Sequence, residues 1–404
     1  MRIVQFASAP GEGLCLHASE LAMALAARGA TVTVVTGAGE QYAGTRDRLA
    51  AAGVAVHTIA GLDESGWLRA RPQPARALAA VLAAEARHGP LVLHVLTPRQ
   101  LTLAARARRA VPGGGIATVV MLSSLRNGRW YEPAAYLAGG ALLRRRADAV
   151  VAQCEAERRK LAPTVPAARL RVIHAWKDVG AFRARLGGAL PPEMRRGTVR
   201  SIDGPPLDPA LPLAVYPAQY RAGKDHALLF RALRLLRDRG VDLACVCPGW
   251  GTHRDAIARA AIAGGVGDRI ALPGRLHQDL VAPFLAQADL VAVPSRAESF
   301  GWVMVEPMIL GLPLVATRVG IAHELEREDA AGIVPPGDAP AFAAALERVL
   351  RDPAAARARA QRGRAYVERA CDLPRVVDAL LGVYESVLRP RAARPASAVP
   401  LPAA

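Results

Sequence analysis

The chain has 404 residues, of which 52% are hydrophobic and 4% aromatic, so it is long enough for two domains with separate cores. No stretch approaches the roughly 20 apolar residues of a membrane span, and five cysteines without a C-x-x-C motif argue against a disulfide framework or a cysteine zinc site. The net charge of +17 is concentrated in residues 1–185, which carry 25 Lys and Arg against 12 Asp and Glu; because the basic stretches lack interleaved aromatics, nucleic acid is not predicted as a partner.

The first half alternates short apolar runs with helical patterns, as is typical of parallel α/β domains. The run Ile3–Ala7 is interpreted as a core strand rather than a signal peptide, because a loop rich in Gly and Pro follows at 10–13. A helix is predicted from about His17 to Arg28. Further strands are predicted at Thr31–Thr36, Val54–Ile59, Leu91–Leu96, Ala117–Leu122 and Ala149–Ala152. Residues 1–185 are therefore predicted to form one doubly wound, Rossmann-like domain.

The second half repeats this rhythm after a segment without periodicity. Residues 186–212 are rich in proline and glycine, which favours a linker or surface excursion. A second doubly wound domain is predicted over 213–373. Its strands are predicted at Leu213–Pro217, Leu243–Cys247, Arg269–Leu272, Leu290–Pro294, Leu314–Thr317 and Gly332–Val334. The helix at 374–388 is expected to cross back to the first domain, and residues 389–404 are expected to be a disordered tail.

A pair of glutamates follows the predicted strand Leu290–Pro294. Glu298 lies in the loop and Glu306 eight positions later, on a helix predicted to begin near Trp302. Ligands of open α/β sheets bind at the carboxyl ends of the strands, Gly301 lets the backbone approach a ligand, and a helix N-terminus attracts anions. Carboxylates do not themselves attract phosphate, so the pair predicts recognition of neutral hydroxyls, as on a sugar and a ribose.

A cationic loop follows the first strand of the same domain. Arg221 and Lys224 flank Gly223 just before a helix predicted to start at Asp225, and His226 is predicted to be a surface residue in the first turn of that helix. Together with the helix N-terminus near Gly301, these cations suit a diphosphate leaving group, whose charge develops as its bond to a sugar breaks.

These segments resemble the GT-B glycosyltransferases of retaining family 4, and the resemblance covers nearly the whole chain. Glu298 to Glu306 matches the family's EX7E motif. The segment QYRAGKDH at 219–226 is similar to the family's Arg/Lys loop, and it most resembles the form of that loop found in lipid-linked oligosaccharide mannosyltransferases. Other typical segments are Gly11–Gly13, Val172–Phe182, Pro248–Gly251, Leu272–Leu276 and Leu310–Thr317. The resemblance implies an α/β, GT-B fold of two Rossmann-like doubly wound domains that face a central cleft.

The resemblance also implies roles for matching residues. Glu298 would bind the donor sugar, and Arg221 and Lys224 would contact its diphosphate; these three are the catalytic candidates. The remaining candidates would also bind the donor: Glu306 at the ribose, Phe300 and Gly301 with Ser299 at the phosphates, Arg275 and Leu276 at the base, and Gly13 over the phosphates. The family retains anomeric configuration and needs no metal or other cofactor, and this sequence has no Asp-x-Asp to hold a metal.

The acceptor side departs from the family's pattern. Many members place a histidine near the end of the fourth strand of the first domain, whereas this chain has Met121-Leu122-Ser123-Ser124 there. Ser123, Ser124 and His17 are therefore the acceptor-side candidates. His94 is a further substitute, although a structural role explains it as well.

The predicted function is a cytoplasmic, metal-independent glycosyltransferase that moves a sugar from a nucleotide-diphosphate sugar to an unidentified acceptor. A non-catalytic subunit that binds a nucleotide-sugar or a partner enzyme is the alternative, and a sugar-nucleotide epimerase of the same fold is a third. The basic first half favours peripheral attachment to an anionic membrane surface, on its inner face. An arginine-rich surface that results from GC-rich coding explains the same charge.

Overall fold

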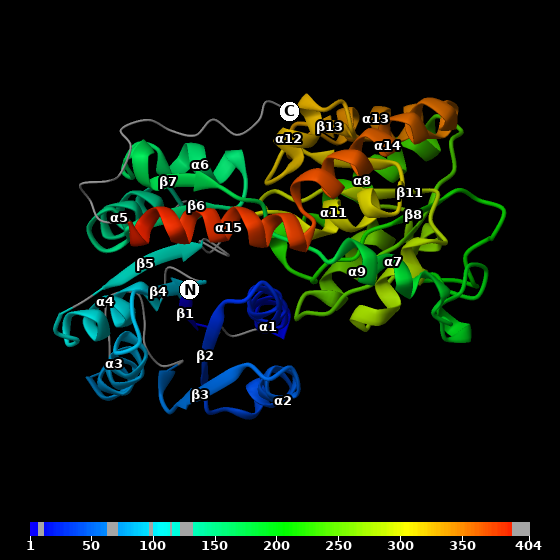
Figure 1. Ribbon diagram of the computed structural model, residues 1–404. Helices are drawn as coiled ribbons and strands as arrows, with labels where there is room; N and C mark the ends of the chain where they lie inside the picture. Colours follow the sequence, from blue (N-terminus) through cyan, green and yellow to red (C-terminus); the bar gives the residue numbers. More distant parts are fainter. Residues whose placement is uncertain (7–11, 63–71, 97–99, 114, 122–131, 390–404) are drawn as a thin grey trace. The chain divides into compact units, whose positions relative to one another are not determined.

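The computed structural model describes residues 1–6, 12–62, 72–96, 100–113, 115–121 and 132–389. The chain forms two units, one of Met1–Trp176 together with the chain from Leu373 onward, and one of Lys177–Asp372 (Figure 1). The boundary was expected after residue 185, but it lies at Trp176. The residues just after Trp176 belong to the second unit because they are bonded to its last residues. Lys177 N donates to Cys371 O at 2.8 Å, and Val179 N donates to Asp372 Oδ1 at 3.2 Å.

The first unit contains a seven-stranded parallel sheet in the order β3-β2-β1-β4-β5-β6-β7. Its strands are β1 Arg2–Phe6, β2 Thr31–Gly37, β3 Ala55–Ile59, β4 Leu91–Val95, β5 Ile116–Met121, β6 Ala149–Ala152 and β7 Leu170–Val172. The central strands β4, β5 and β6 are buried along their whole length, as near-continuous apolar runs in a parallel sheet predict. The sequence interpretation missed β7, whose Arg171 is exposed.

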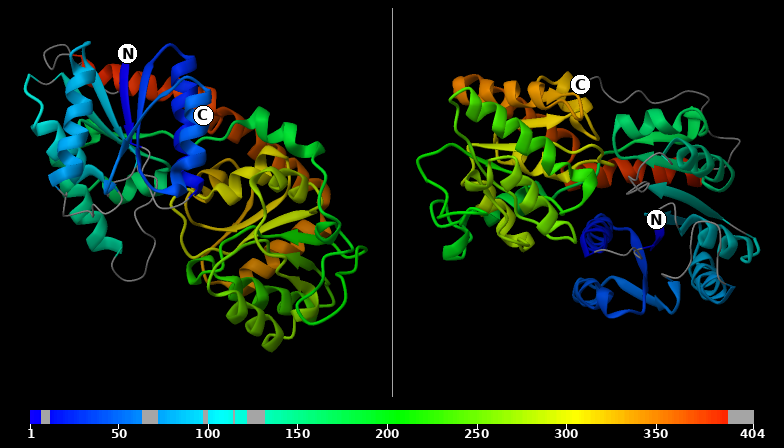
Figure 2. Two further views of the ribbon diagram at one scale, coloured as in Figure 1. Left: turned by 90° about the horizontal axis from the view of Figure 1, so that it is seen from below. Right: turned by 180° about the vertical axis from the view of Figure 1, so that it is seen from behind.

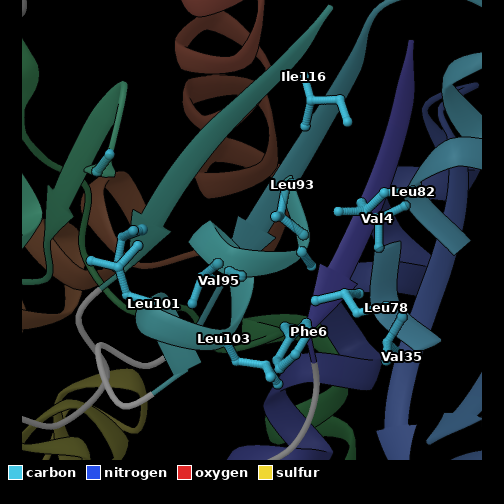
Figure 3. Packing of buried hydrophobic residues seen from close by; sticks show 14 of the residues in the cluster. Val4, Phe6, Val35, Leu78, Leu82, Leu93, Val95, Leu101, Leu103 and Ile116 are labelled. Carbon is cyan, nitrogen blue, oxygen red and sulfur yellow. The ribbon is translucent and has the colours of Figure 1, made fainter. Parts of the chain in front are cut away.

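Helices cover both faces of this sheet (Figure 2). They are α1 Glu12–Ala27, α2 Ala43–Ala51, α3 Pro72–Ala86, α4 Leu101–Arg109, α5 Glu132–Arg146, α6 Glu155–Leu161 and α15 Leu373–Leu388. Figure 3 shows the core on the α3 and α4 face, where Val4 and Phe6 of β1 lie against Leu78 and Leu82 of α3. The opposite face packs against α1 and α15. The described part of the chain from Leu373 therefore completes the core of the first unit.

The second unit contains a six-stranded parallel sheet in the order β10-β9-β8-β11-β12-β13. Its strands are β8 Leu213–Val215, β9 Ala244–Val246, β10 Ile270–Ala271, β11 Leu290–Val293, β12 Leu314–Thr317 and β13 Gly332–Val334. The strand order reverses between β8 and β11, which pair directly. Each sheet therefore has the doubly wound, Rossmann-like topology that the sequence predicts, and β8 and β11 form the switch point where ligands bind in such sheets.

The helices of the second unit are α7 Val179–Ala184, α8 His226–Asp238, α9 Arg254–Ala263, α10 Val281–Leu285, α11 Trp302–Ile309, α12 Ala322–Arg327, α13 Ala339–Arg351 and α14 Pro353–Ala370. Aspartates begin four of them. Asp178, Asp225, Asp338 and Asp352 each accept a hydrogen bond from a main-chain amide in the first turn, which satisfies a donor that the helix itself leaves free. This capping fixes where α8 starts beside the cationic loop.

Residues 186–212 belong to the second unit. Ile202 N donates to Ile270 O at 2.8 Å, and the Arg196 guanidinium lies 3.1 Å from the Asp289 carboxylate. The side chains of Val199 and Leu207 are buried. Of the two expected forms, a linker or a surface excursion, these contacts fit the second, because the segment packs onto the α/β layer of its own unit. The predicted tail lies outside the described residues from residue 390.

Candidate donor site

The two predicted loops of the second unit meet at the switch point of its sheet. The cationic loop follows β8 and the glutamate loop follows β11. Arg296 N donates to Gly223 O at 3.0 Å, and Arg296 Nε lies 2.7 Å from Asp225 Oδ2. Since Asp225 also caps α8, one carboxylate fixes both the helix start and the neighbouring loop.

The Glu298 side chain is held by two contacts that are both made to one of its carboxylate oxygens. Its Oε1 lies 2.5 Å from Lys224 Nζ and accepts a hydrogen bond of 2.7 Å from Ser295 Oγ. The side chain is only 8% exposed, so these two donors offset the cost of removing a charge from water. Oε2 has no hydrogen-bond partner among the described residues. It remains free to accept a hydrogen bond from a ligand.

A buried tyrosine supports this arrangement from below. Tyr216 follows β8, and its hydroxyl lies 2.8 Å from Lys224 O and 2.9 Å from Ser295 Oγ. Burial, and then the negative charge of Glu298, raise the pKa of Tyr216 well above its ordinary value. The tyrosine therefore stays protonated and connects the lysine loop to the serine that holds Glu298.

The side chain of Arg221 has a buried nitrogen without a hydrogen-bond acceptor among the described residues. Its Nε is buried and makes no hydrogen bond within the described part of the chain. A buried donor without an acceptor is costly, so such groups commonly mark a place where a ligand or water binds. Arg221 and Lys224 therefore bracket the same loop, as the sequence predicts, with one side chain paired to Glu298 and the other unsatisfied.

The turn before α11 depends on two glycines with left-handed backbone. Gly301 has φ +104° and begins α11, and Gly320 has φ +55°. A Cβ on Gly320 would lie 2.2 Å from Phe300 O, and the next amide, Ile321 N, donates to the same oxygen at 2.8 Å. Phe300 is buried. The backbone of the phosphate-binding candidates is thus held by the segment that follows β12.

Glu306 is also held on one oxygen, by a residue that the sequence interpretation missed. Lys177 Nζ lies 2.7 Å from Glu306 Oε1, with the two side chains 18% and 15% exposed. Glu306 lies on α11 one turn after Trp302, so both face the same side of the helix. Lysine is rare here, since Lys160, Lys177 and Lys224 are the only three among 52 Lys and Arg. That rarity is the sequence signal that could have identified Lys177.

The base-binding candidates lie at the ends of β9 and β10. Gly249 N donates to Gly274 O at 2.8 Å, and the Arg275 guanidinium lies 5.7 Å from the centre of the Trp250 ring. Trp250 is 53% exposed, which is unusual for so large an apolar side chain. Leu276 is partly buried. This edge of the second unit therefore presents an exposed aromatic ring beside a cation.

His226 corrects a prediction of surface exposure. It is buried, and its ring lies 5.1 Å from that of Tyr216 and 5.7 Å from that of Tyr220. Burial, and then the charge of Lys224, lower the pKa of His226 to about 4. His226 is therefore a neutral core residue beneath the site.

The predicted residues of the first unit do not form a comparable cluster among the described positions. Gly13 lies in the first turn of α1, which begins at Glu12 rather than near His17. His17 Nδ1 lies 3.3 Å from Glu20 Oε2, and its ring makes an edge contact with Trp176. Ser123 and Ser124 lie outside the described residues.

His94 of the first unit is structural. It is buried in β4, where Nδ1 lies 2.9 Å from the Tyr384 hydroxyl of α15. Burial lowers the pKa of His94 to about 3. The hydrogen bond ties α15 to the sheet of its own unit.

Among the described residues, no group of three or more His, Cys, Asp or Glu side chains could hold a metal ion. None of the helices described is long and apolar enough to cross a membrane.

Comparison with known proteins decides the family. The family "Glycosyl transferase 4-like domain" matches residues 12–176, and "Glycosyl transferases group 1" matches residues 212–352. The D-inositol 3-phosphate glycosyltransferase of Mycolicibacterium smegmatis is 31% identical over 411 residues, which cover 95% of this chain and 89% of that protein. The chain belongs to the group 1 glycosyltransferases. This confirms the resemblance to family 4 that the glutamate and Arg/Lys motifs indicated.

Solved structures show that this group 1 glycosyltransferase has the GT-B fold. HepE from Anabaena in complex with UDP has a TM-score of 0.73 at 18% identity, covering 96% of this chain and 100% of that one. A glycosyltransferase from Rickettsia africae has a TM-score of 0.75 at 16% identity, covering 96% of this chain and 98% of that one. The predicted fold class is therefore confirmed.

Proposed function

We propose that this glycosyltransferase moves a hexose from a nucleotide-diphosphate sugar to an unidentified acceptor, with retention of configuration and without a metal ion. The observation that carries the proposal is the geometry of Glu298. Its Oε1 is held by Lys224 and Ser295 at the switch point of the sheet, and its Oε2 has no hydrogen-bond partner among the described residues. A fixed carboxylate with one acceptor oxygen left suits a sugar hydroxyl.

The cations account for the leaving group. Arg221 and Lys224 would neutralise the charge that builds on the diphosphate as its bond to the sugar breaks, together with the positive end of the helix dipole at the start of α11. The unsatisfied Arg221 Nε would gain an acceptor when phosphate binds. Lys224 would lie between its carboxylate partner and the diphosphate, so one ammonium would position the sugar-binding and phosphate-binding groups together.

The remaining donor contacts are proposed on the same geometry. Glu306 would accept from the ribose, the main chain of Ser299 to Gly301 would face the phosphates, and Arg275 with Leu276 would meet the base. Gly13 stays a proposal for phosphate binding, and His17, Ser123 and Ser124 stay acceptor-side proposals. Support for a nucleotide-sugar donor comes from HepE, which was solved with UDP and with UDP-glucose.

A transfer assay tests the proposal. A thermal-shift screen across nucleotide-sugars first identifies the donor, because a ligand that binds only the folded state raises the unfolding temperature. Release of radiolabelled sugar to water or acceptor is then followed for the wild type and Glu298→Gln. We expect the variant to lose activity by about a hundredfold or more, as the loss of a hydrogen bond to a charged group in the transition state requires. Unchanged turnover in Glu298→Gln would contradict the proposed site, and donor binding without turnover would favour the non-catalytic alternative.

We also propose peripheral attachment to an anionic membrane surface in the cytoplasm. Arg109 ends α4, and Arg145 and Arg146 end α5. Burial, and then the charges of Arg109 and Arg145, lower the pKa of Arg146, so these like charges lie close together in the first unit. Sedimentation with vesicles of phosphatidylcholine, with and without phosphatidylglycerol, measures the effect. Equal binding to both would remove this proposal.

A further inference from the structure

The ammonium of Lys177 lies in a closely defined environment. Besides its 2.7 Å contact with Glu306 Oε1, it lies 5.0 Å from the centre of the Phe182 ring and 5.9 Å from that of Trp302. Phe182 is 1% exposed. Cation–π contacts of this kind favour a cation between the rings, so the lysine has few alternative positions.

The main chain at Lys177 is fixed as well. Lys177 N donates to Cys371 O at 2.8 Å, and the next residue, Asp178, caps α7. A side chain that begins on a fixed backbone and ends in a cage loses little entropy when it holds its partner. The carboxylate of Glu306 is consequently oriented by a group 129 positions away in the sequence.

The two glutamates share one arrangement. Each has a lysine on Oε1, and each Oε2 lacks a hydrogen-bond partner among the described residues. Two of the three lysines of an arginine-rich chain are used in this way. A planar guanidinium would present several donors in a broad fork, whereas an ammonium is a compact charge that fits a single oxygen between two rings.

We propose that Lys177 is a positioning residue for the donor: it fixes Glu306 through Oε1 so that Oε2 accepts from the ribose hydroxyls of the nucleotide. This inference rests on the proposed function. It predicts that Lys177 acts only through Glu306 and only on ligands with ribose hydroxyls. A lysine that touched the diphosphate itself, or that merely stabilised the fold, would not discriminate between ligands in this way.

Calorimetric titration of the full chain tests the inference with UDP, GDP and ADP and with their 2′,3′-dideoxy forms. For the nucleotide that binds the wild type, we expect Lys177→Met to weaken affinity by about tenfold, the effect of one hydrogen bond between charged or polar groups. The variant is expected to bind the dideoxy form as well as the wild type does. Glu306→Gln should show the same pattern, and the double variant should lose no more than either single variant.

Matched variants complete the design. Lys160→Met removes the remaining lysine, which is exposed on α6, and should leave both affinities unchanged. Lys224→Met should weaken both forms alike, because phosphate is present in each. An equal loss for both forms in Lys177→Met, no loss, or tighter binding would each overturn the inference while the proposed function stands. A wild type that binds none of these nucleotides or their sugars would overturn the proposed function itself.

Discussion

Ser295 contributes to the site through one hydroxyl with two neighbours. It is fully buried, donates to Glu298 Oε1 and lies 2.9 Å from the Tyr216 hydroxyl. Its main-chain oxygen accepts a hydrogen bond from Thr317 Oγ1, which ties the backbone at Ser295 to β12. The carboxylate orientation therefore depends on a group that touches no ligand in the proposed mechanism.

Replacement of Ser295 by alanine should reduce kcat/KM by roughly tenfold. Glu298 would keep Lys224 but lose its second donor, and the net value of a hydrogen bond to a charged group is about 1.5–3 kcal/mol. Steady-state transfer rates at several donor concentrations measure the effect. Ser386→Ala is the control, because that hydroxyl only donates within α15, to Val383 O; an equal loss in both variants would contradict the assigned role.

At the scale of elements, the start of α11 depends on the turn that follows β12. Gly320 can lie against Phe300 O only because it has no Cβ. Elsewhere in the second unit, Gly337 has a similar left-handed backbone, with φ +83°, but a Cβ there would meet nothing within 4 Å. At both positions a residue other than glycine would have to adopt a strained, left-handed backbone. Only at Gly320 would its Cβ also meet a neighbouring atom.

Replacing Gly337 or Gly320 by alanine should lower the stability of the second unit by different amounts. Gly337→Ala should lower the free energy of unfolding by about 1 kcal/mol, from backbone strain alone. Gly320→Ala should cost about 2 kcal/mol more, because the new methyl group must push the Phe300 carbonyl away. Urea unfolding monitored by circular dichroism measures both. Similar midpoints for the two variants would show that the contact with Phe300 relaxes freely.

The sequence predicted the elements best where burial was complete. Strand β11 is an uninterrupted apolar run that ends before Pro294, and β4 follows Pro90 and is apolar apart from His94. Both were placed within a residue or two. The edge strand β7 was missed because Arg171 faces solvent and the run is only three residues long. The start of α1 was placed too late, because Gly11–Gly13 was read as a loop although the helix begins at Glu12.

The site was predictable where chemistry is local in the sequence. Glu298 and Glu306 share one strand–loop–helix unit, and Lys224 follows the neighbouring strand in the switch-point topology. Lys177 was not predictable from spacing, because its partner comes from packing between α11 and the segment before α7. His226 was misread because the helix face that it occupies is set by Tyr216 and Tyr220 beneath it, and periodicity does not reveal those neighbours.

At the scale of the molecule, the two units have separate sheets and cores, so they can unfold in separate steps. Each buries titratable groups that its unfolded chain exposes. In the first unit burial raises the pKa of Glu157 to about 8 and lowers that of His94 to about 3. In the second unit burial lowers the pKa of His226 to about 4.

These shifts set opposite pH trends. A histidine with a lowered pKa adds stability above its unfolded pKa near 6.5 and loses it as pH falls toward the folded value. Glu157 has a raised pKa, so its unit is most stable below the unfolded value of 4.5 and loses stability as pH rises through about 8. Between pH 4.5 and 6.5 the two groups of the first unit oppose each other. Above pH 6.5 the loss from Glu157 exceeds the small remaining gain from His94, and the first unit should lose about 1 kcal/mol by pH 8.

Glu157→Gln isolates this effect. A glutamine cannot ionise, yet its amide oxygen can still accept the 2.8 Å hydrogen bond that Gln153 N gives to Glu157 Oε2. Urea unfolding at pH 6.5, 7.2 and 8, with limited proteolysis to follow the first unit, should show a decline in the wild type and a flat response in the variant. The second unit should change by less than about 0.5 kcal/mol over this range in both proteins, because His226 is neutral in the folded chain and at most half protonated in the unfolded chain. A decline of the first unit that persists in Glu157→Gln would mean that another group titrates there, since the buried carboxyl would then be gone.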